Sequence, residues 1–320
     1  MTAPRNGLLL LSSGSKAAIT RIAKTAAGKR GIALHASDVA ENVPSRHFAD
    51  HFTALPPSCS PRWEATLLDY CSRNRIGLVI PTRHADLPKL AQLRPKLEAN
   101  GTAVAVSSPE TVSLCVNKLE TARHLRSIGA PTPETWLKRS LDLQSIALAF
   151  PLIAKPSDGA ASTIQRIENQ AQLSDVPDDW ILQPVAHGSE YTVNLYLDRH
   201  GEALCAIPHR RLAVESGEVV QARTERIEAL IELCRNVARS LPQARGIINI
   251  QAFHQPGPET IEIIEINPRI GGGYPLCDAA KGHYIEWLCR EYLDGSELSP
   301  FDQWTEQLLM MRYRDAIFSL

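Results

Sequence analysis

The sequence predicts an α/β fold in its N-terminal part and an α+β arrangement in its C-terminal half. Residues 7–116 alternate apolar strand segments with helical segments, which is the pattern of a parallel sheet with right-handed crossovers. Residues 190–198, 246–254 and 260–267 instead have strand composition with only one long amphipathic helix among them, at 223–240. A chain of 320 residues is long enough for two or three units around a sizeable core.

The N-terminal elements follow one another closely. We expect strands at residues 7–11, 31–36, 77–80 and 102–106, with helices at 15–29, 63–74 and 86–100 and another beginning at Ser108-Pro109-Glu110. The turn after the first strand reads S-S-G-S-K and lacks the G-x-G-x-x-G spacing of a dinucleotide site, although Asp38 resembles the acid that binds a ribose. An NAD-linked oxidoreductase is therefore the weakest functional hypothesis.

Composition excludes several classes of protein. Hydrophobic residues make up 44% and charged residues 22% of the chain, and the net charge of −1 gives no electrostatic reason to expect nucleic acid or an acidic membrane as a partner. The seven cysteines form no C-x-x-C pair, which favours reduced thiols over disulfides or zinc. The apolar stretch at residues 8–11 is too short for a signal peptide, and no apolar run approaches ~18 residues. We expect a cytoplasmic protein.

The most informative stretch is T-I-E-I-I-E-I-N-P-R-I-G-G-G, residues 260–273. Residues two apart in a strand share a face, so Glu265 and Asn267 are expected on one face and Glu262 on the other. If the hairpin formed with residues 246–254 turns near Pro258, Gln251 lies opposite Glu265. A carboxylate and two amide oxygens, followed at once by Arg269, predict a site for hard cations on a phosphate chain.

A second candidate site begins at Lys155. This lysine ends an apolar strand, residues 151–155, and precedes the small-residue loop P-S-D-G-A-A-S-T, which would let backbone N–H groups approach phosphate oxygens. The loop lacks the Walker A spacing. Taken alone, Lys155 and Lys118 could equally be surface charges.

Order and spacing bring these segments together. Lys118, Lys155 with its loop, W-I-L-Q at 180–183, Glu190, and Gln251 fourteen residues before E-I-N-P-R resemble the ATP-grasp superfamily, above all its carbamoyl-phosphate-synthetase-like members and small carboxylate–amine ligases. The resemblance covers nearly the whole chain. It implies a Rossmann-like pre-ATP-grasp domain at 1–116, a small lid subdomain of the ATP-grasp fold at 117–186, and a large subdomain with the metal site at 187–320.

The resemblance also implies residue roles. Lys118 and Lys155 would contact the ATP phosphates, with the loop of Asp158, Gly159 and Ser162 closing over them. The hinge of Gln183, Pro184 and Val185 would face the adenine, and Glu190 the ribose. Mg²⁺, or Mn²⁺ in its place, would be held by Gln251, Glu265 and Asn267, while Arg269 and Lys155 would act on the transferring phosphoryl group.

The chain departs from the family pattern at three points. Gln183 and Gln251 stand where many members have Glu, and the loop after Lys155 has one glycine where others have several. For the second substrate, the side chains of Arg210 and Arg211 suit a carboxylate, although a solvated basic turn is equally compatible. Gly272 and Tyr274 resemble the loop that shapes the acceptor pocket in related ligases.

The leading hypothesis is an ATP- and Mg²⁺-dependent ligase that phosphorylates a small-molecule carboxylate and joins it to an amine, with an amino acid or peptide-like substrate. Two alternatives stay open: a carbamoyl-phosphate-type reaction on bicarbonate or carbamate, and a nucleotide-binding regulator without catalysis. The expected partners are the two small substrates and, by analogy with related enzymes, a second copy in a homodimer, with no nucleic acid and no membrane.

Overall fold

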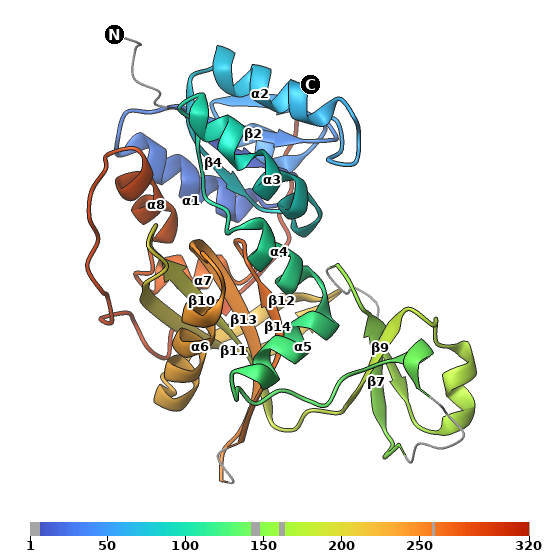
Figure 1. Cartoon of the computed structure of the whole chain (residues 1–320). Helices are drawn as coiled ribbons and strands as arrows, with labels where there is room; N and C mark the ends of the chain where they lie inside the picture. Colours follow the sequence, from blue (N-terminus) through green and yellow to red (C-terminus); the bar gives the residue numbers. More distant parts are fainter. Residues whose placement is uncertain (1–6, 142–147, 160–163, 258–259, 320) are drawn as a thin grey trace.

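The computed structural model describes residues 7–141, 148–159, 164–257 and 260–319. This part of the chain contains a five-stranded, a four-stranded and a six-stranded sheet (Figure 1). The predicted combination of a parallel α/β unit with antiparallel C-terminal sheets is confirmed.

The five-stranded sheet is parallel throughout, in the order β3-β2-β1-β4-β5. Its elements are β1 Gly7–Leu11, α1 Ala17–Gly28, β2 Leu34–Asp38, β3 His51–Ala54, α2 Trp63–Arg73, β4 Ile76–Pro81, α3 Leu87–Ala99 and β5 Ala103–Val104. Leu8 and Leu10 of β1 face the core shared with α1, whereas Leu9 and Leu11 face the core under α2 and α3. Side-chain alternation along one buried strand thus places helices on both faces of the sheet.

The four-stranded sheet is antiparallel, in the order β6-β9-β7-β8. Its strands are β6 Trp136–Leu137, β7 Leu152–Pro156, β8 Gln165–Ile167 and β9 Trp180–Pro184. It has a small core of its own around Leu152, Ala154 and Leu182. In Figure 1 it projects from the rest of the molecule, joined to it by the chain before β6 and the chain after β9.

The six-stranded sheet, in the order β14-β13-β10-β11-β12-β15, forms the centre of the C-terminal half. Its strands are β10 Ser189–Leu197, β11 Ala203–Glu215, β12 Glu218–Thr224, β13 Gly246–Gln255, β14 Thr260–Asn267 and β15 Leu309–Met311. One face packs on α6 Glu228–Ser240. The sequence predicted a strand only to residue 207 and a helix from 223, but β11 and β12 form a long hairpin there. Ser216 and Gly217, both with positive φ, make the tight turn that allows it.

The helices between the sheets tie the units together. Helices α4 Pro109–Val116 and α5 Lys118–Ser127 both pack on β14, and α1 packs on α7 Tyr274–Ala279 and α8 Tyr284–Tyr292. Asn117 begins α5, and its Oδ1 accepts hydrogen bonds from the backbone N–H groups of Leu119 at 3.0 Å and Glu120 at 3.2 Å. Asn117 therefore fixes the start of α5, and Lys118 is the first residue of that helix.

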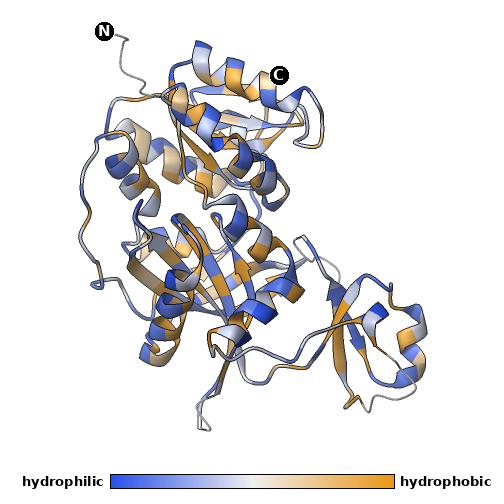
Figure 2. Ribbon diagram, in the orientation of Figure 1, coloured by the Kyte–Doolittle hydropathy of each residue, from blue (hydrophilic) through white to orange (hydrophobic). Residues whose placement is uncertain are grey.

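Hydropathy follows this arrangement. The strands of the central sheets are coloured largely as hydrophobic, while the surface helices carry both colours (Figure 2). Within the described residues, no helix has both the length and the apolarity needed to cross a membrane.

Candidate functional site

One face of the large sheet carries α6, and the other carries a row of polar side chains. Residues paired across antiparallel strands share a face, so the pairs Thr192–Gln251, Thr192–His209 and Gln251–Glu265 place four strands' side chains together. The residues on this face are Glu190, Thr192, Asn194, His209, Arg211, Asn249, Gln251, Glu265 and Asn267. The sheet therefore gathers on one surface most of the oxygen-bearing residues singled out in the sequence.

The predicted pairing of Gln251 with Glu265 is present in the structure. The Gln251 amide can take two orientations. In one, Nε2 donates to Glu265 Oε2 at 2.8 Å and Oε1 accepts from Arg211 Nη1 at 2.5 Å. The opposite orientation turns the amide oxygen toward the carboxylate, and two acceptors facing each other need a cation between them. Only this second orientation leaves the Gln251 oxygen free to bind a cation together with Glu265.

The predicted orientation of Glu262 is wrong. The register of β13 and β14 shifts after Gln251, so that Ala252 pairs with Ile263 and Phe253 with Glu262. This β-bulge inserts one residue into β14 and moves Glu262 to the same face as Glu265, two residue pairs closer to the hairpin turn. Simple alternation cannot anticipate a bulge, because it counts every residue as one step.

The segment after β14 is held in place by three contacts. Arg269 Nη2 donates to Asn267 Oδ1 at 3.3 Å and Arg269 Nη1 donates to the carbonyl of Ile270 at 2.9 Å. Asn249 Nδ2 donates to the carbonyl of Arg269. A Cβ atom on Gly273 would lie 2.5 Å from His209 Nε2, so only glycine allows this loop to approach the sheet so closely. The guanidinium of Arg269 is thereby fixed beside the carboxamide of Asn267.

The two predicted phosphate-binding lysines come from different elements and meet near Glu265. Both are nearly buried, with 3% of Lys118 and 5% of Lys155 exposed. Burial lowers the pKa of Lys155 to about 8, and it lowers the pKa of Lys118 as well; in each case the Glu265 carboxylate acts in the opposite direction. A carboxylate surrounded by cations is an arrangement that can organise a metal and a polyphosphate together.

The loop after Lys155 contacts the start of α5. Lys118 Nζ donates to the carbonyl of Gly159 at 2.5 Å, the Lys118 N–H donates to the carbonyl of Ser157 at 2.8 Å, and Asp158 forms a β-bridge with Asn117. Ser162, predicted to cover the phosphates, lies outside the described residues. The part of the loop that is described is thus anchored beside Lys118.

The predicted adenine hinge ends the small sheet. The Gln183 side chain is buried, and its Nε2 donates to Thr135 Oγ1 at 2.8 Å, while Pro184 is exposed and Val185 half-buried. The Gln183 side chain is therefore engaged in a hydrogen bond within the protein. An adenine base at this position would contact the backbone groups of residues 183–185. Glu190, predicted to face the ribose, accepts from Arg211 Nη1 at 2.8 Å, and burial raises the pKa of this carboxyl.

The side chains of Arg210 and Arg211 do not converge on a common ligand. Because both lie inside β11, their side chains point to opposite faces: Arg211 is on the polar face with Glu190, and Arg210 pairs with Tyr191 on the α6 side. The prediction that both bind one substrate carboxylate is wrong. It treated the segment as a turn, whereas the strand continues to Glu215.

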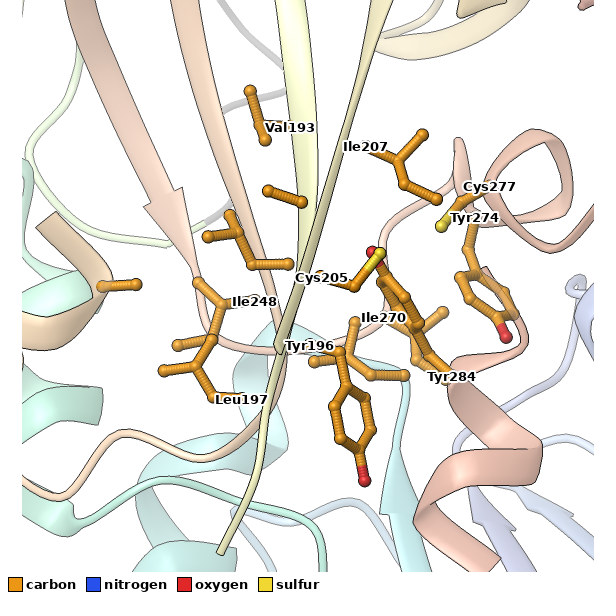
Figure 3. Close-up of a cluster of buried hydrophobic side chains, with 14 of the residues drawn as sticks. Val193, Tyr196, Leu197, Cys205, Ile207, Ile248, Ile270, Tyr274, Cys277 and Tyr284 are labelled. Atoms are coloured by element: carbon orange, nitrogen blue, oxygen red, sulfur yellow. The ribbon is translucent and has the colours of Figure 1, made fainter. Parts of the chain in front are cut away.

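Tyr274 is also misassigned as a substrate residue. Its side chain is completely buried, its hydroxyl donates to Asp278 Oδ1 at 3.3 Å, and it accepts from the Ile285 N–H at 3.0 Å. Figure 3 shows Tyr274 beside Cys277 within the hydrophobic cluster. It packs α7 against α8, and Asp278 is part of the same contact. Gly272, in contrast, lines a cavity.

The N-terminal unit contributes two residues that the sequence reasoning missed. Lys16 follows β1, and its Nζ donates to the Thr82 carbonyl at 2.5 Å and to Thr82 Oγ1 at 3.2 Å. Burial and, to a smaller extent, the charge of Arg269 together lower the pKa of Lys16 to about 8. His84, just after β4, lies near Arg269 and Glu265, and burial lowers its pKa. The carboxyl ends of adjacent parallel strands form the usual binding edge of such a sheet, which is the signal that could have identified both residues.

The hydrogen bonds of Asp38 in the same unit argue against a dinucleotide site. Asp38 Oδ2 accepts from the Gly14 N–H at 2.8 Å, and Asp38 Oδ1 accepts from the Val39 N–H at 2.8 Å. A Cβ atom on Gly14 would lie 2.5 Å from Asp38 Oδ2. The carboxylate that resembled a ribose ligand is therefore used to hold the first turn.

These elements enclose a cavity of about 510 Å³. Its lining residues include Lys16, His84, Gly159, Thr192, Arg211, Glu218, Asn249, Gln251, Asn267, Arg269 and residues 271–273. Among the described residues, buried atoms of its lining side chains that have no hydrogen-bond partner include Arg211 Nε, Asn249 Oδ1 and Arg269 Nε. Buried polar groups of this kind are seldom left unpaired, so the cavity is built for a polar ligand.

The donor set fits Mg²⁺ bound together with a polyphosphate. In the described part of the chain no cluster of three His, Cys, Asp or Glu side chains could hold a metal alone. Mg²⁺ is ordinarily held by one or two carboxylates, with substrate phosphates and water completing its octahedron. Glu265 supplies one such carboxylate, and the side-chain amides of Gln251 and Asn267 lie on the same face of the sheet.

Two protein families match this chain. An ATP-grasp domain matches residues 115–273, and a PylC-like N-terminal domain matches residues 8–105. The chain belongs to the ATP-grasp superfamily. The carbamoyl phosphate synthase large chain of Clostridium acetobutylicum is 22% identical over 227 residues, covering 64% of this ATP-grasp chain and 21% of its own length. This chain thus spans about a fifth of that relative.

Solved structures show the same ATP-grasp fold. The biotin carboxylase domain dimer of Hydrogenobacter thermophilus 2-oxoglutarate carboxylase, in complex with MgADP, ADP and bicarbonate, has a TM-score of 0.70 at 14% identity and covers 91% of this chain and 70% of its own. An L-amino acid ligase from Bacillus licheniformis has a TM-score of 0.70 at 16% identity, covering 91% of this chain and 75% of its own.

Proposed function

We propose that this protein is an ATP- and Mg²⁺-dependent ligase that converts a small-molecule carboxylate to an acyl phosphate and joins it to an amine. The observation that carries the proposal is the convergence of Lys118, Lys155 and Arg269 on Glu265, which faces Gln251 across the strand pair. One carboxylate neutralises only one of three cations, so a purely structural arrangement would leave positive charge uncompensated. A polyphosphate would supply the missing negative charge.

The proposed ATP site runs along the junction of the small and large sheets. Lys155 and Lys118 bind the phosphates under the loop at Asp158 and Gly159, and the adenine lies against the backbone of 183–185. Glu190 accepts from the ribose hydroxyls, sharing its carboxylate with Arg211. Gln251, Glu265 and Asn267 would hold Mg²⁺, or Mn²⁺ in its place, which would neutralise phosphate charge.

Charge dictates what the residues must do. Transfer of a phosphoryl group to a carboxylate brings two anions together, so the site must neutralise both and hold them in line. Arg269, fixed by Asn267 and by the Ile270 carbonyl, presents a guanidinium that cannot lose its proton at neutral pH. We assign it to the carboxylate oxygen and to the phosphoryl group that this oxygen receives. An acyl phosphate hydrolyses in water, so the site must close during the reaction.

The overall chemistry balances in two steps. The carboxylate oxygen forms a bond to the γ-phosphorus while the bond to ADP breaks. The amine nitrogen then bonds to the carbonyl carbon and phosphate departs. Of the three protons on the incoming ammonium, one stays in the amide, one leaves on hydrogen phosphate and one passes to solvent.

Release of ADP tests the proposal. The protein is incubated with Mg-ATP and a panel of carboxylates, with hydroxylamine as a nucleophile that traps acyl phosphates as hydroxamates. Carboxylate-dependent ADP release with a matching hydroxamate is the expected result. Tight Mg-ATP binding without turnover over a broad panel would instead favour a regulator, and ADP release dependent on bicarbonate alone would favour the carbamoyl-phosphate-type reaction. A homodimer stays a prediction, to be measured by analytical ultracentrifugation.

A further inference from the structure

A second cavity, of about 690 Å³, lies between the N-terminal unit and the C-terminal segment. Its walls come from the start of α1, from residues 42–48 around the short 3₁₀ helix Pro44–His47, and from residues 310–319. This volume is in the range of pockets that enclose a small molecule. It shares Lys16, Glu218 and Gly272 with the cavity beside Arg269, so the two are neighbours that meet at these three residues.

The second cavity combines cations with apolar surface. Arg21 and Arg312 line it in addition to Lys16, and its apolar lining comes from Ile19, Val43, Phe48, Met310 and Ile317. The Arg21 guanidinium lies over the Phe48 ring, 5.0 Å from its centroid, and forms no ion pair within the described residues. A guanidinium held by an aromatic face keeps its in-plane N–H groups available for a carboxylate.

Glu218 is the carboxylate at the junction of the two cavities. It stands at the start of β12, and Arg312 Nη1 lies 3.5 Å from its Oε2. Its charge also acts on Lys16 and on Arg269, which places it between the N-terminal unit and the phosphoryl site. Arg312 Nη2 donates to the carbonyl of Gly272, so the C-terminal segment is tied to the same point. An ammonium group entering from the second cavity would meet Glu218 before it reached Arg269.

From this arrangement we infer that the second cavity is the acceptor subsite, and that it takes an amine bearing a carboxylate and an apolar side chain. An α-amino acid such as leucine, methionine or phenylalanine fits this description. Its ammonium lies at Glu218, its carboxylate lies at Arg21 and Arg312, and its side chain lies against Val43, Phe48 and Met310. Glu218 is a positioning residue that directs the nitrogen toward the acyl group and relays one proton to solvent.

This inference rests on the proposed function but can be tested without turnover. Isothermal titration of the full chain in the presence of MgADP compares L-leucine, L-methionine and L-phenylalanine with glycine and with L-leucinamide, which lacks the carboxylate. At least one apolar amino acid is expected to bind about tenfold more tightly than both glycine and leucinamide, a difference of roughly 1.4 kcal/mol. Absence of binding at about 10 mM, well above ordinary KM values, would overturn the inference.

Matched variants locate the binding. Arg21→Ala and Arg312→Ala should each raise the dissociation constant for the amino acid about tenfold, because each removes one charged donor to the carboxylate. Lys24→Ala on the same helix and Arg314→Ala on the same segment serve as controls, since neither residue lines the cavity. If all four variants behave alike, the cavity is not the binding site.

The two proposals fail in different ways. Amino-acid binding with this variant pattern in a protein that never releases ADP leaves the cavity assignment intact and contradicts the ligase. Carboxylate-dependent ADP release in a protein whose Arg21 and Arg312 variants bind amino acids normally supports the ligase and overturns the acceptor subsite.

Discussion

At the scale of single residues, Glu265 is the carboxylate on which the cations of the site converge. Its charge raises the pKa of Lys118, Lys155 and Arg269, and also that of His84, whose pKa burial lowers. We predict that Glu265→Gln lowers kcat by about 10²-fold or more, since loss of one preorganised charge at a phosphoryl site costs ~3 kcal/mol of barrier. Steady-state ADP release measures this.

Glu262 provides the control for that substitution. It lies on the same strand and, because of the bulge, on the same face, but opposite Phe253 rather than Gln251. Glu262→Gln should keep kcat within about twofold of wild type, an energy of less than ~0.5 kcal/mol. Equal losses of kcat in both variants would mean that the metal assignment is wrong, and that Glu265 and Glu262 contribute only through the negative charge they share.

Lys155 predicts a pH dependence. In the free protein its pKa is about 8, lowered by burial, so the ammonium is charged below pH 8 and neutral above it. Phosphate binding needs the charge, and kcat/KM for ATP should therefore fall as pH rises through about 8. In Lys155→Arg the guanidinium stays charged, and the fall should shift upward or disappear. A profile unchanged by the substitution would remove Lys155 from the phosphate site.

Residue-level prediction from sequence succeeded for the pairing of Gln251 with Glu265, although not for the reason expected. The pairs beside the turn, such as Gln255 with Thr260, would by simple counting place Gln251 opposite Ile264, and the bulge adds the one residue that brings Glu265 there. Prediction failed at Glu262 and at Arg210, because a bulge and an extended strand change which side chains share a face without leaving a signal in composition. Lys16 and His84 were missed for another reason: they belong to a different unit and reach the site only through tertiary packing.

At the scale of elements, the connection from the small sheet into β10 is tightly constrained. Gly188 has φ +99°, and a Cβ atom there would lie 2.3 Å from the carbonyl oxygen of His254. Gly188→Ala should lower the free energy of unfolding by roughly 2–4 kcal/mol, combining backbone strain of ~1–3 kcal/mol with a clash against fixed backbone. Thermal unfolding followed by circular dichroism measures the change.

Gly217 separates strain from contact in that experiment. It also has a positive φ, +81°, in the turn between β11 and β12, but a Cβ atom there would meet nothing within 4 Å. Gly217→Ala should therefore cost only the backbone term, about 1 kcal/mol. If Gly188→Ala is no worse than Gly217→Ala, the chain at 188 can move away from β13 at little cost.

Elements with strong apolar patterns were predictable, and short strands without such a pattern were not. The strands β1, β4, β13 and β14 carry uninterrupted or alternating apolar residues and matched the structure closely. The strands β3, β6, β8 and β15 are two to four residues long and lie at or next to sheet edges. Their sequences, such as H-F-T-A, become strands because a neighbouring strand offers hydrogen bonds, which is a property of the assembled sheet.

At the scale of the whole molecule, the site draws its residues from three sheets. The parallel sheet brings Lys16 and His84, the small sheet brings Lys155, and the large sheet brings Glu265 and Gln251. In Figure 1 the small sheet stands away from the other two, while α5 runs beside the connection to it. The domain bounds 1–116, 117–186 and 187–320 remain a proposal. The contacts of α5 with β14 tie the start of the middle segment to the large sheet, and those of α4 do the same for the end of the first segment.

This arrangement predicts that nucleotide draws the small sheet inward. Lys155 sits on β7 of the small sheet. The residues proposed to bind the Mg-nucleotide with it, Lys118 and Glu265, lie on α5 and β14, which belong to or pack on the large sheet. A Mg-nucleotide bound to all three is a bridge that the empty site lacks, so its binding energy favours the closed arrangement.

Small-angle X-ray scattering should therefore show a smaller radius of gyration with a non-hydrolysable Mg-ATP analogue. We expect a fall of roughly 0.5–1 Å toward the ~20 Å of a compact chain of this length. Lys155→Met serves as the matched variant: it removes the small sheet's cation, so the analogue should bind more weakly and, even at saturation, compact the protein less. Equal compaction in wild type and variant would show that closure does not depend on the bridge through Lys155, and no compaction in either would mean that the small sheet already occupies its final position.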